Sequence, residues 1–494
     1  MTAKRRRCPT MNQAPAIHNG LFKPAVKALL GLLVLVLAAC VLPQRPDPNL
    51  PGRHWLKKGQ PPLAQDLRDQ PTIIDTDRPL GFDDCVFLAM QQAPGLIHGA
   101  VELEIAQLRK DSAYWKQYPE VQMVFNVTNN LTRRNDGETD FLVGFSVNSY
   151  NPVANHFSHE ASMIMQNIAI LTHQKAIETM AEQIGEILLR LELQAATRQK
   201  QEILPELARK AQAYWRTTKS DPEYDSIELA RAIQKQKQAQ AILDKTDAEM
   251  ASQRLNLKLL LGLDPAHTLN LESSFPKMFN TKSMGFDQAG APNWEPAWEA
   301  SAETRISQLS LRLQDFNIML AWSRYLPETG VDIFSGNPVS GYVDNSTGGD
   351  LFAVLKLSIP LLDYGNRSRG VEEARLQKTK TKESARQYRL NFEHRWTQAD
   401  QNLNLLKATR ALTEENLVLF KLEVKRATIE FESGQSSFAH VLEAQEKVTR
   451  EEIRLAEALF NLRRQKLNRH FMSGDFARRF FGPQLTPDNH TSVE

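Results

Sequence analysis

Residues 392–431 read FEHRWTQADQNLNLLKATRALTEENLVLFKLEVKRATIEF, without a proline or a glycine. Apolar or small residues recur there at heptad spacing, at Phe392, Trp396, Ala399, Leu403, Leu406, Leu417, Phe420, Val424, Ala427 and Phe431. That pattern predicts a helix wound against other helices. We expect one long helix from Val371, a turn at 432–437 (ESGQSS) and a second helix ending near Gly474. A helix of about 60 residues is about 90 Å long, and a compact globule has no use for such a rod.

The preceding chain alternates helices with pairs of strands. Helices are expected from about 83 to 118, with a break at Pro94, and two strands at 121–127 and 141–147. A long helix follows from about Ser158 to Thr218, kinked at Pro205. A turn at 220–222 leads to a helix that Asp225 caps and that ends at Leu261. A connector follows. After it we expect a helix at 302–325 and strands at 331–335 and 351–359, which lead into the long helical hairpin of residues 371–474.

The chain is therefore a duplication, since helix, strand, strand, long helix, turn and helix occur twice. Ala232 matches Ala444 and Gly262 matches Gly474, both at an offset of 212 residues. Such internal repeats determine the architecture. The domain boundaries that follow are 1–39 for a lipoprotein signal peptide, 40–82 for a lipid anchor and proline-rich tether, 83–264 for the first repeat, 265–300 for a connector (the equatorial region), 301–474 for the second repeat and 475–494 for a C-terminal tail.

The amino terminus has the pattern of a secretory signal. Basic residues precede a short apolar run at 28–39, which is too short to span a bilayer as a helix. The run ends in Leu37-Ala38-Ala39-Cys40, similar to the lipobox of bacterial lipoproteins, in which Cys40 would carry the lipid. The alternative is an ordinary signal followed by a chance cysteine. Apart from Cys8 in the signal, only Cys85 remains, so the mature chain has no intramolecular disulfide.

The first strand pair alternates apolar with mostly polar residues, which fits a membrane barrel wall. The residues expected to face lipid are Val121, Met123, Phe125, Phe141, Val143 and Phe145. A soluble sheet packed on a core would alternate equally well. Four strands cannot close a membrane barrel, because the smallest use about 8, whereas three chains would pool 12. The fold class expected is mainly α with a small membrane β-barrel, with helical hairpins forming a trimeric tunnel.

No catalytic or metal-binding pattern emerges. His159-Glu160-Ala161-Ser162-Met163 begins like a zinc-protease helix but lacks the second histidine. There is no phosphate-binding glycine loop and no nucleophile elbow in the sequence. A net charge of +2 gives no reason to expect a nucleic-acid partner. We therefore expect no enzyme activity, no cofactor and no metal.

The sequence resembles the TolC-type outer-membrane efflux channels, including their lipid-anchored members. The resemblance covers about residues 83–474. It is carried by LSIPLLDYG at 357–365, GQSSFAHVLEA at 434–444 and LLLG at 259–262. It implies a homotrimer in the outer-membrane lipid with a 12-stranded barrel and a periplasmic helical tunnel. It also implies a periplasmic adaptor (a membrane fusion protein) and an inner-membrane pump of RND or ABC type that dock at the tunnel tip.

The resemblance implies tip, gate or adaptor-contact roles for nine residues, which are Asp221, Pro222, Asp225, Glu228, Phe431, Gly434, Ser436, His440 and Glu443. Three of them depart from the family pattern. His440 stands where an acidic residue is common, Ser436 where some members carry a gating arginine, and Phe431 where some have a gating tyrosine. His440 could sense pH, or be merely solvated, and Glu443 could line the pore mouth, or simply face water.

Two functions from different classes remain. One is a passive outer-membrane exit duct of a tripartite efflux or secretion system. The other is a non-channel coiled-coil lipoprotein that acts as an envelope scaffold. Two amphipathic strand pairs placed identically in two repeats favour the duct. The transported substrate is not encoded by any residue pattern.

Overall fold

The computed structural model describes residues 79–128, 140–217, 222–271, 293–335, 351–359, 363–476 and 480. Its elements, in chain order, are α4 (Phe82–Gln92), α5 (Pro94–Trp115), β1 (Val121–Thr128), β2 (Asp140–Tyr150), α6 (Pro152–Gln201), α7 (Ile203–Thr217), α8 (Pro222–Leu261), α10 (Trp294–Ala300), α11 (Ala302–Ser323), β3 (Glu328–Ser335), β4 (Leu351–Ser358), α12 (Asn366–Glu432) and α13 (Phe438–Met472). The predicted signal peptide, Cys40 and the tether up to residue 78 lie outside these residues. The last residues assigned to the tether are described, and Leu80 and Phe82 among them are buried in the core, with α4 beginning at Phe82. No helix within them combines the length and the apolar character needed to cross a membrane.

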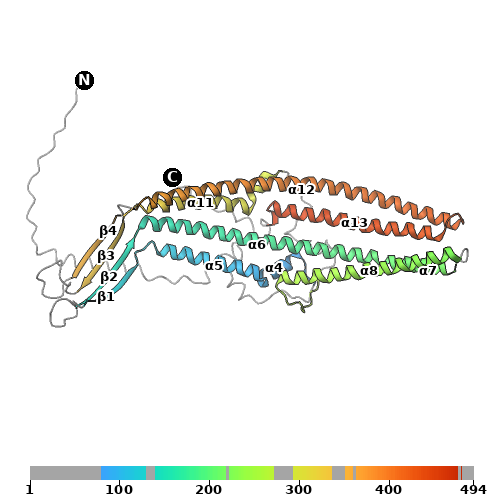
Figure 1. Ribbon diagram of the computed structural model, residues 1–494, viewed down its shortest axis with the longest axis horizontal. Helices are drawn as coiled ribbons and strands as arrows, with labels where there is room; N and C mark the ends of the chain where they lie inside the picture. Colours follow the sequence, from blue (N-terminus) through green and yellow to red (C-terminus); the bar gives the residue numbers. More distant parts are fainter. Residues whose placement is uncertain are drawn as a thin grey trace, which may run out of the picture. The chain divides into compact units, whose positions relative to one another are not determined.

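The two halves repeat one arrangement, as Figure 1 shows. In the second half, α11 and α13 both pack against the 67-residue helix α12. In the first half, α5 and α8 pack against α6 in the same way. Two shorter helices therefore run along each long one.

The four strands form one antiparallel sheet in the order β1-β2-β3-β4. The hairpin of each repeat contributes two neighbouring strands, and β2 pairs with β3 to join the repeats. Since β2 leads into α6 and β4 into α12, the sheet lies at the end of the long helices opposite their turns. The strands β1 and β4 keep one unpaired edge each within the described sheet.

The core lies midway along α6. Buried apolar side chains of α4, α6, α8 and α13 meet there, among them Phe82, Ile184, Leu257 and Leu467. Cys85 belongs to this core as a free cysteine, and burial, followed by the charge of Asp84, raises the pKa of its thiol to about 12. The thiol is therefore protonated at neutral pH and unreactive.

Several helix starts differ from the prediction for a local reason. The helix α6 begins at Pro152 rather than near Ser158, because the Asn151 side chain accepts a hydrogen bond of 3.0 Å from the Ala154 amide and caps it. The predicted cap at Asp225 is wrong, because α8 already begins at Pro222. The break between α6 and α7 comes at Glu202, three residues before Pro205, close to where the kink is expected.

A glycine with positive φ ends the helices α8 and α12. Gly262 has φ +73° and Gly434 has φ +76°. In both turns the amide after the glycine donates to a carbonyl of the last helical turn, from Leu263 to Lys258 and from Gln435 to Glu430. These are Schellman closures, which need a left-handed residue. The predicted role of Gly434 as the turn residue is confirmed.

Candidate functional site

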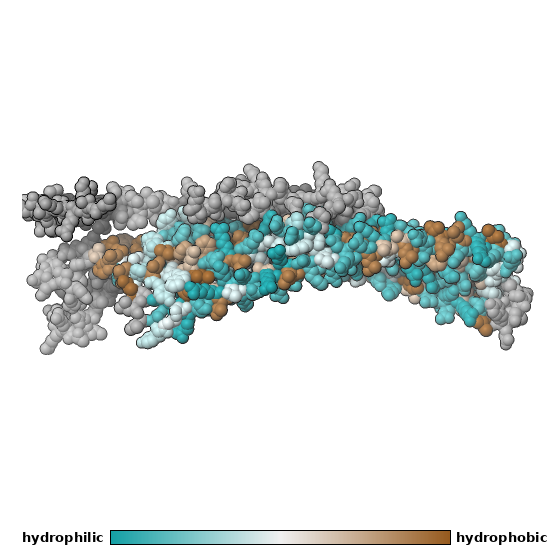
Figure 2. Space-filling view, turned by 90° about the horizontal axis from the view of Figure 1, so that it is seen from above, coloured by the Kyte–Doolittle hydropathy of each residue, from teal (hydrophilic) through white to brown (hydrophobic). Residues whose placement is uncertain are grey.

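The outward apolar face of the sheet is the first candidate site. Of the six residues expected to face lipid, Val121, Met123, Phe125 and Phe145 are exposed, with Phe125 at 64%. The cross-strand pairs Met123–Phe145 and Phe145–Ile333 place them on one face. The side chains of Phe141 and Val143 lie outside the described ones. Leu355 and Leu357 of β4 add exposed apolar side chains, and Figure 2 shows hydrophobic residues gathered at the sheet end.

The opposite face of the sheet is polar. Ser146 donates a hydrogen bond of 2.6 Å to Asp332 Oδ1, and the Lys356 ammonium pairs with Asp332 Oδ2. The three side chains come from β2, β3 and β4, so this network ties the two repeats together. Only Lys356 is exposed. The sequence does not predict this network directly, although the polar positions that alternate with the apolar ones in both hairpins are a signal for it. The sheet therefore has one face suited to lipid and one suited to water.

The turns at the other end of the helices hold the second candidate site. The His440 Nδ1 atom lies 3.2 Å from Ser436 Oγ and 4.0 Å from Glu430 Oε2. The structure thus brings together two of the residues that depart from the family pattern. The rings of Phe431 and Phe438 lie 5.3 Å apart. Asp221 and the side chains of Pro222 and Asp225 lie outside the described part of the chain.

A groove beside these turns involves two further expected residues. It has a volume of about 400 Å³ and lies between α7, α8 and α13. Glu228 and Glu443 both line it, together with Trp215 and Leu442. Lys235 Nζ lies 3.0 Å from Glu446 Oε2 across α8 and α13, which ties the first hairpin to the second. Both apolar and charged side chains line the groove, as they do in a surface for a partner helix.

Buried ionisable groups on α6 were not expected from the sequence. His173 and Glu178 are 2% and 7% exposed. Burial lowers the pKa of His173 to about 4, and neither ring nitrogen has a hydrogen-bond partner among the described residues. Burial raises the pKa of Glu178 to about 7, although the nearby charge of Lys175 lowers it. The heptad pattern gave no signal for them, since it treats every inward position as apolar.

His173 packs so tightly on α5 that it gives a testable prediction. A Cβ added at Gly99 would lie 2.6 Å from His173 Nδ1. We expect Gly99→Ala to lower the free energy of unfolding by about 1–3 kcal/mol, as overpacking does. His173→Ala should remove most of that penalty in the double variant. The measurement is the midpoint of thermal unfolding of the four proteins. Fully additive effects in the double-mutant cycle would contradict the contact.

None of these sites has the make-up of a catalytic centre. Within the described part of the chain, no three His, Cys, Asp or Glu side chains gather in a way that could hold a metal ion. The polar network on the sheet contains a serine, an aspartate and a lysine, but the aspartate pairs with both partners and leaves no activated nucleophile.

Comparison with known proteins agrees with this geometry. Residues 301–468 match the family model described as "Outer membrane efflux protein". No curated protein sequence is significantly similar to the chain. Among solved structures, CusC has a TM-score of 0.65 at 14% identity, covering 82% of this chain and 95% of CusC.

Two further structures share the fold. The CmeC outer membrane channel of Campylobacter jejuni has a TM-score of 0.65 at 13% identity, with 80% of this chain and 85% of CmeC covered. The outer membrane protein VceC of Vibrio cholerae has a TM-score of 0.62 at 13% identity, with 81% and 96% covered. At such identities the likeness shows a common fold.

Proposed function

We propose that this chain, whose residues 301–468 match the outer membrane efflux protein family, is the passive exit duct of a tripartite efflux or secretion system. The observation that carries the proposal is the two-faced sheet at one end of two very long helical hairpins. Its apolar face, with Met123 and Phe125 exposed, suits lipid, and its polar face, with Lys356, suits water. A coiled-coil scaffold has no need of such a sheet.

The duct we propose is a homotrimer. The free edges of β1 and β4 would be costly in lipid, because backbone groups there must be satisfied by other strands. Three copies would close a barrel of 12 strands, above the minimum of about 8. The long helix α12 supports this assembly, since apolar side chains along it are exposed in the single chain. Among them are Leu376, Leu390, Leu405, Leu412, Leu419, Leu422 and Ile429.

The partners we propose are a periplasmic adaptor and an inner-membrane pump of RND or ABC type. The groove lined by Trp215, Leu442 and Glu443 is their docking surface, since it could receive an amphipathic helix. The pump supplies the energy, and the duct conducts passively. We also propose lipid anchoring at Cys40 in the outer membrane, tested by mass spectrometry of the mature amino terminus of the protein and of Cys40→Ser.

Conductance in planar bilayers tests the duct directly. The purified full-length protein should give discrete conductance steps. Lys356→Glu should shift the ion selectivity toward cations, because it reverses a charge on the face proposed to line the pore. Leu355→Gln is the matched control on the opposite face and should impair insertion instead of selectivity. Absence of conductance, including from variants at His440 and Glu443 that loosen the tip, would contradict the proposal.

A charge reversal at the tip gives a second prediction. Glu443 is exposed at the groove wall, one turn before the paired Glu446. We expect Glu443→Lys to alter gating or adaptor binding by about 1 kcal/mol, about fivefold in affinity, because rim charges contribute modestly. Assembly should be unchanged by light scattering of the purified protein. Failure to trimerise would instead give Glu443 a structural role.

A further inference from the structure

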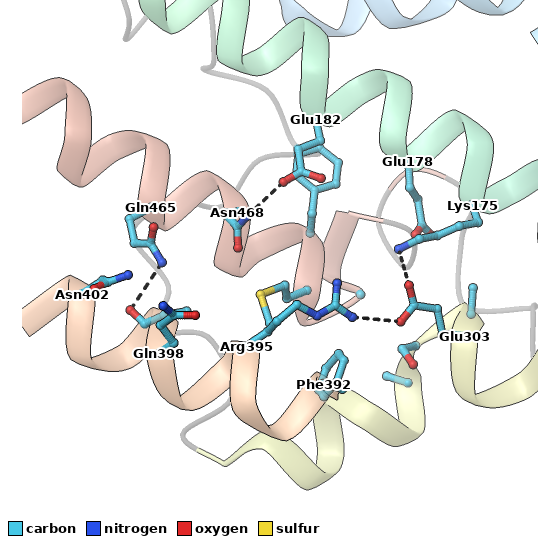
Figure 3. A pocket seen from close by; sticks show the side chains of 17 residues that line it. Lys175, Glu178, Glu182, Glu303, Phe392, Arg395, Gln398, Asn402, Gln465 and Asn468 are labelled. Atoms are coloured by element: carbon cyan, nitrogen blue, oxygen red, sulfur yellow. Dashed lines mark hydrogen bonds and ion pairs between the residues drawn. The ribbon is translucent and has the colours of Figure 1, made fainter. Parts of the chain in front are cut away.

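A cavity of about 250 Å³ lies between α6, α11, α12 and α13. None of the residues that line it belongs to the strands, or to the turns that join α7 to α8 and α12 to α13. Its wall is mostly polar, as Figure 3 shows. Carboxylates come from α6 and the start of α11, a guanidinium and amides from α12, and further amides from α13. Phe392 and Met472 add apolar surface. Nothing in the proposed duct makes use of this cavity.

The charges in the cavity do not balance. Glu303 pairs with both cations, since its carboxylate lies 3.3 Å from Lys175 Nζ and 3.3 Å from Arg395. Glu178 and Glu182 have no ion pair within 4.0 Å among the described residues. Each accepts one hydrogen bond, from Gln174 at 3.2 Å and from Asn468 at 3.2 Å. Both bonds go to Oε1, so the Oε2 atoms of two carboxylates are left for another partner.

Burial makes this imbalance costly. The Glu178 side chain is only 7% exposed, and its carboxylate lines the cavity. Burial raises the pKa of Glu178 to about 7 and also raises the pKa of Glu182. The ionised carboxylate of Glu178 is therefore poorly stabilised by the groups around it, and a buried carboxylate normally has a cationic partner. A cation in the cavity supplies that partner.

The spacing of the two carboxylates indicates the kind of cation. Glu178 and Glu182 are one helical turn apart and share a face of α6, at about 6 Å between their Cβ atoms. One ammonium group, with three N–H donors, can reach both. The side-chain amides of Gln398 and Asn402 offer further acceptors, and Phe392 offers an apolar and cation-binding surface. Metal coordination is not favoured, as no three acidic or histidine side chains converge in the described residues.

We propose that this cavity binds a small organic ammonium ion, with Glu178 and Glu182 as its counter-ions. The binding does not depend on the duct function, because the cavity is formed by helices of a single chain. A protein that bound the amine without conducting, or conducted without binding, would separate the two proposals.

Calorimetric titration of the purified full-length protein at pH 8 tests the proposal. The probe is 1,4-diaminobutane, and butanol and magnesium chloride at matched ionic strength are the controls. We expect saturable binding of one amine per chain. Glu178→Gln and Glu182→Gln should each weaken it at least tenfold, because each removes a charged hydrogen bond worth about 1.5–3 kcal/mol. Glu192→Gln, on the same helix but paired with Arg463 outside the cavity, should bind as the wild type does.

Further measurements keep the test decisive if an acidic variant fails to fold. Binding to the wild type should weaken as the pH falls from 8 to 5, because Glu178, whose pKa burial raises to about 7, takes up a proton while the amine, with a pKa of about 10, stays charged. The other charged groups of the cavity, Lys175, Glu303 and Arg395, form ion pairs with one another. Asn402→Phe should also abolish binding by filling space. Absence of saturable binding, unchanged binding in Glu178→Gln, or equal binding of Mg²⁺ would overturn the proposal.

Discussion

Gly262→Ala should be among the most destabilising single substitutions in this chain. Gly262 has φ +73°, and a Cβ built there would lie 2.3 Å from the backbone oxygen of Gln92 and 2.6 Å from its carbonyl carbon. Backbone cannot move aside as a flexible side chain can. Left-handed strain of about 1–2 kcal/mol adds to an overlap of about 1–3 kcal/mol. We expect a loss on the order of 4 kcal/mol in the free energy of unfolding, and little folded protein.

Gly434→Ala is the matched control for this prediction. Gly434 closes the equivalent kind of turn with φ +76°, but nothing lies within 4 Å of the position its Cβ would take. Only the conformational strain of about 1–2 kcal/mol remains. Thermal unfolding and the yield of assembled protein compare the two variants. Equal losses would show that the contact between Gly262 and the end of α4 does not matter.

Glu178→Gln should stabilise the protein at alkaline pH. The pKa of Glu178 is raised from its ordinary 4.5 to about 7, chiefly by burial. The folded state therefore binds this proton more tightly than the unfolded chain does. Stability falls as the pH rises from about 4.5, and the loss is complete above about 7. A shift of this size corresponds to on the order of 3 kcal/mol, which glutamine avoids because it carries no charge.

The unfolding midpoint measured between pH 5 and pH 9, without amine present, checks this prediction. The wild type should lose stability over that range relative to Glu178→Gln, and the two should converge near pH 5. His173 acts in the opposite sense, since its lowered pKa of about 4 favours the folded state above pH 6.5 and costs stability below it. Its contribution is the same in both proteins and cancels. Parallel curves for the two proteins would refute the assignment.

The sequence predicts the helices and strands well because heptads and alternation repeat over many residues. The hairpin of α12 and α13, the position of the turn at Gly434 and the pairing of strands within each repeat are all confirmed. Helix starts are harder to predict, because one side chain decides them. Asp363 accepts hydrogen bonds of 3.0 Å from the amides of Gly365 and Arg367, and so α12 begins at Asn366 and not at Val371.

The candidate sites also differ in whether a repeating sequence pattern predicts them. The exposed apolar face of the sheet follows from alternation, so Met123 and Phe125 could be predicted. The carboxylates of the cavity could not, because the heptad pattern of α6 tells which side turns inward and not which helix it meets. Glu182 and Asn468 lie 286 residues apart in the sequence and are hydrogen-bonded only in the folded chain. The registry of α6 against α13 determines which of their side chains come into contact.

The core midway along α6 has a consequence for how the protein is made. Leu80 and Phe82, near the start of the described chain, share that core with Leu467, Phe471 and Phe476, near its end. Its most buried layer is complete only when nearly the whole polypeptide is available. A chain that folds only after export has its whole length present when this core forms. A ribosome-bound or truncated chain lacks the C-terminal residues of the core and leaves the apolar side chains of the other residues exposed. Loss of the last 30 residues should therefore send the product to proteolysis instead of yielding a shorter, working form.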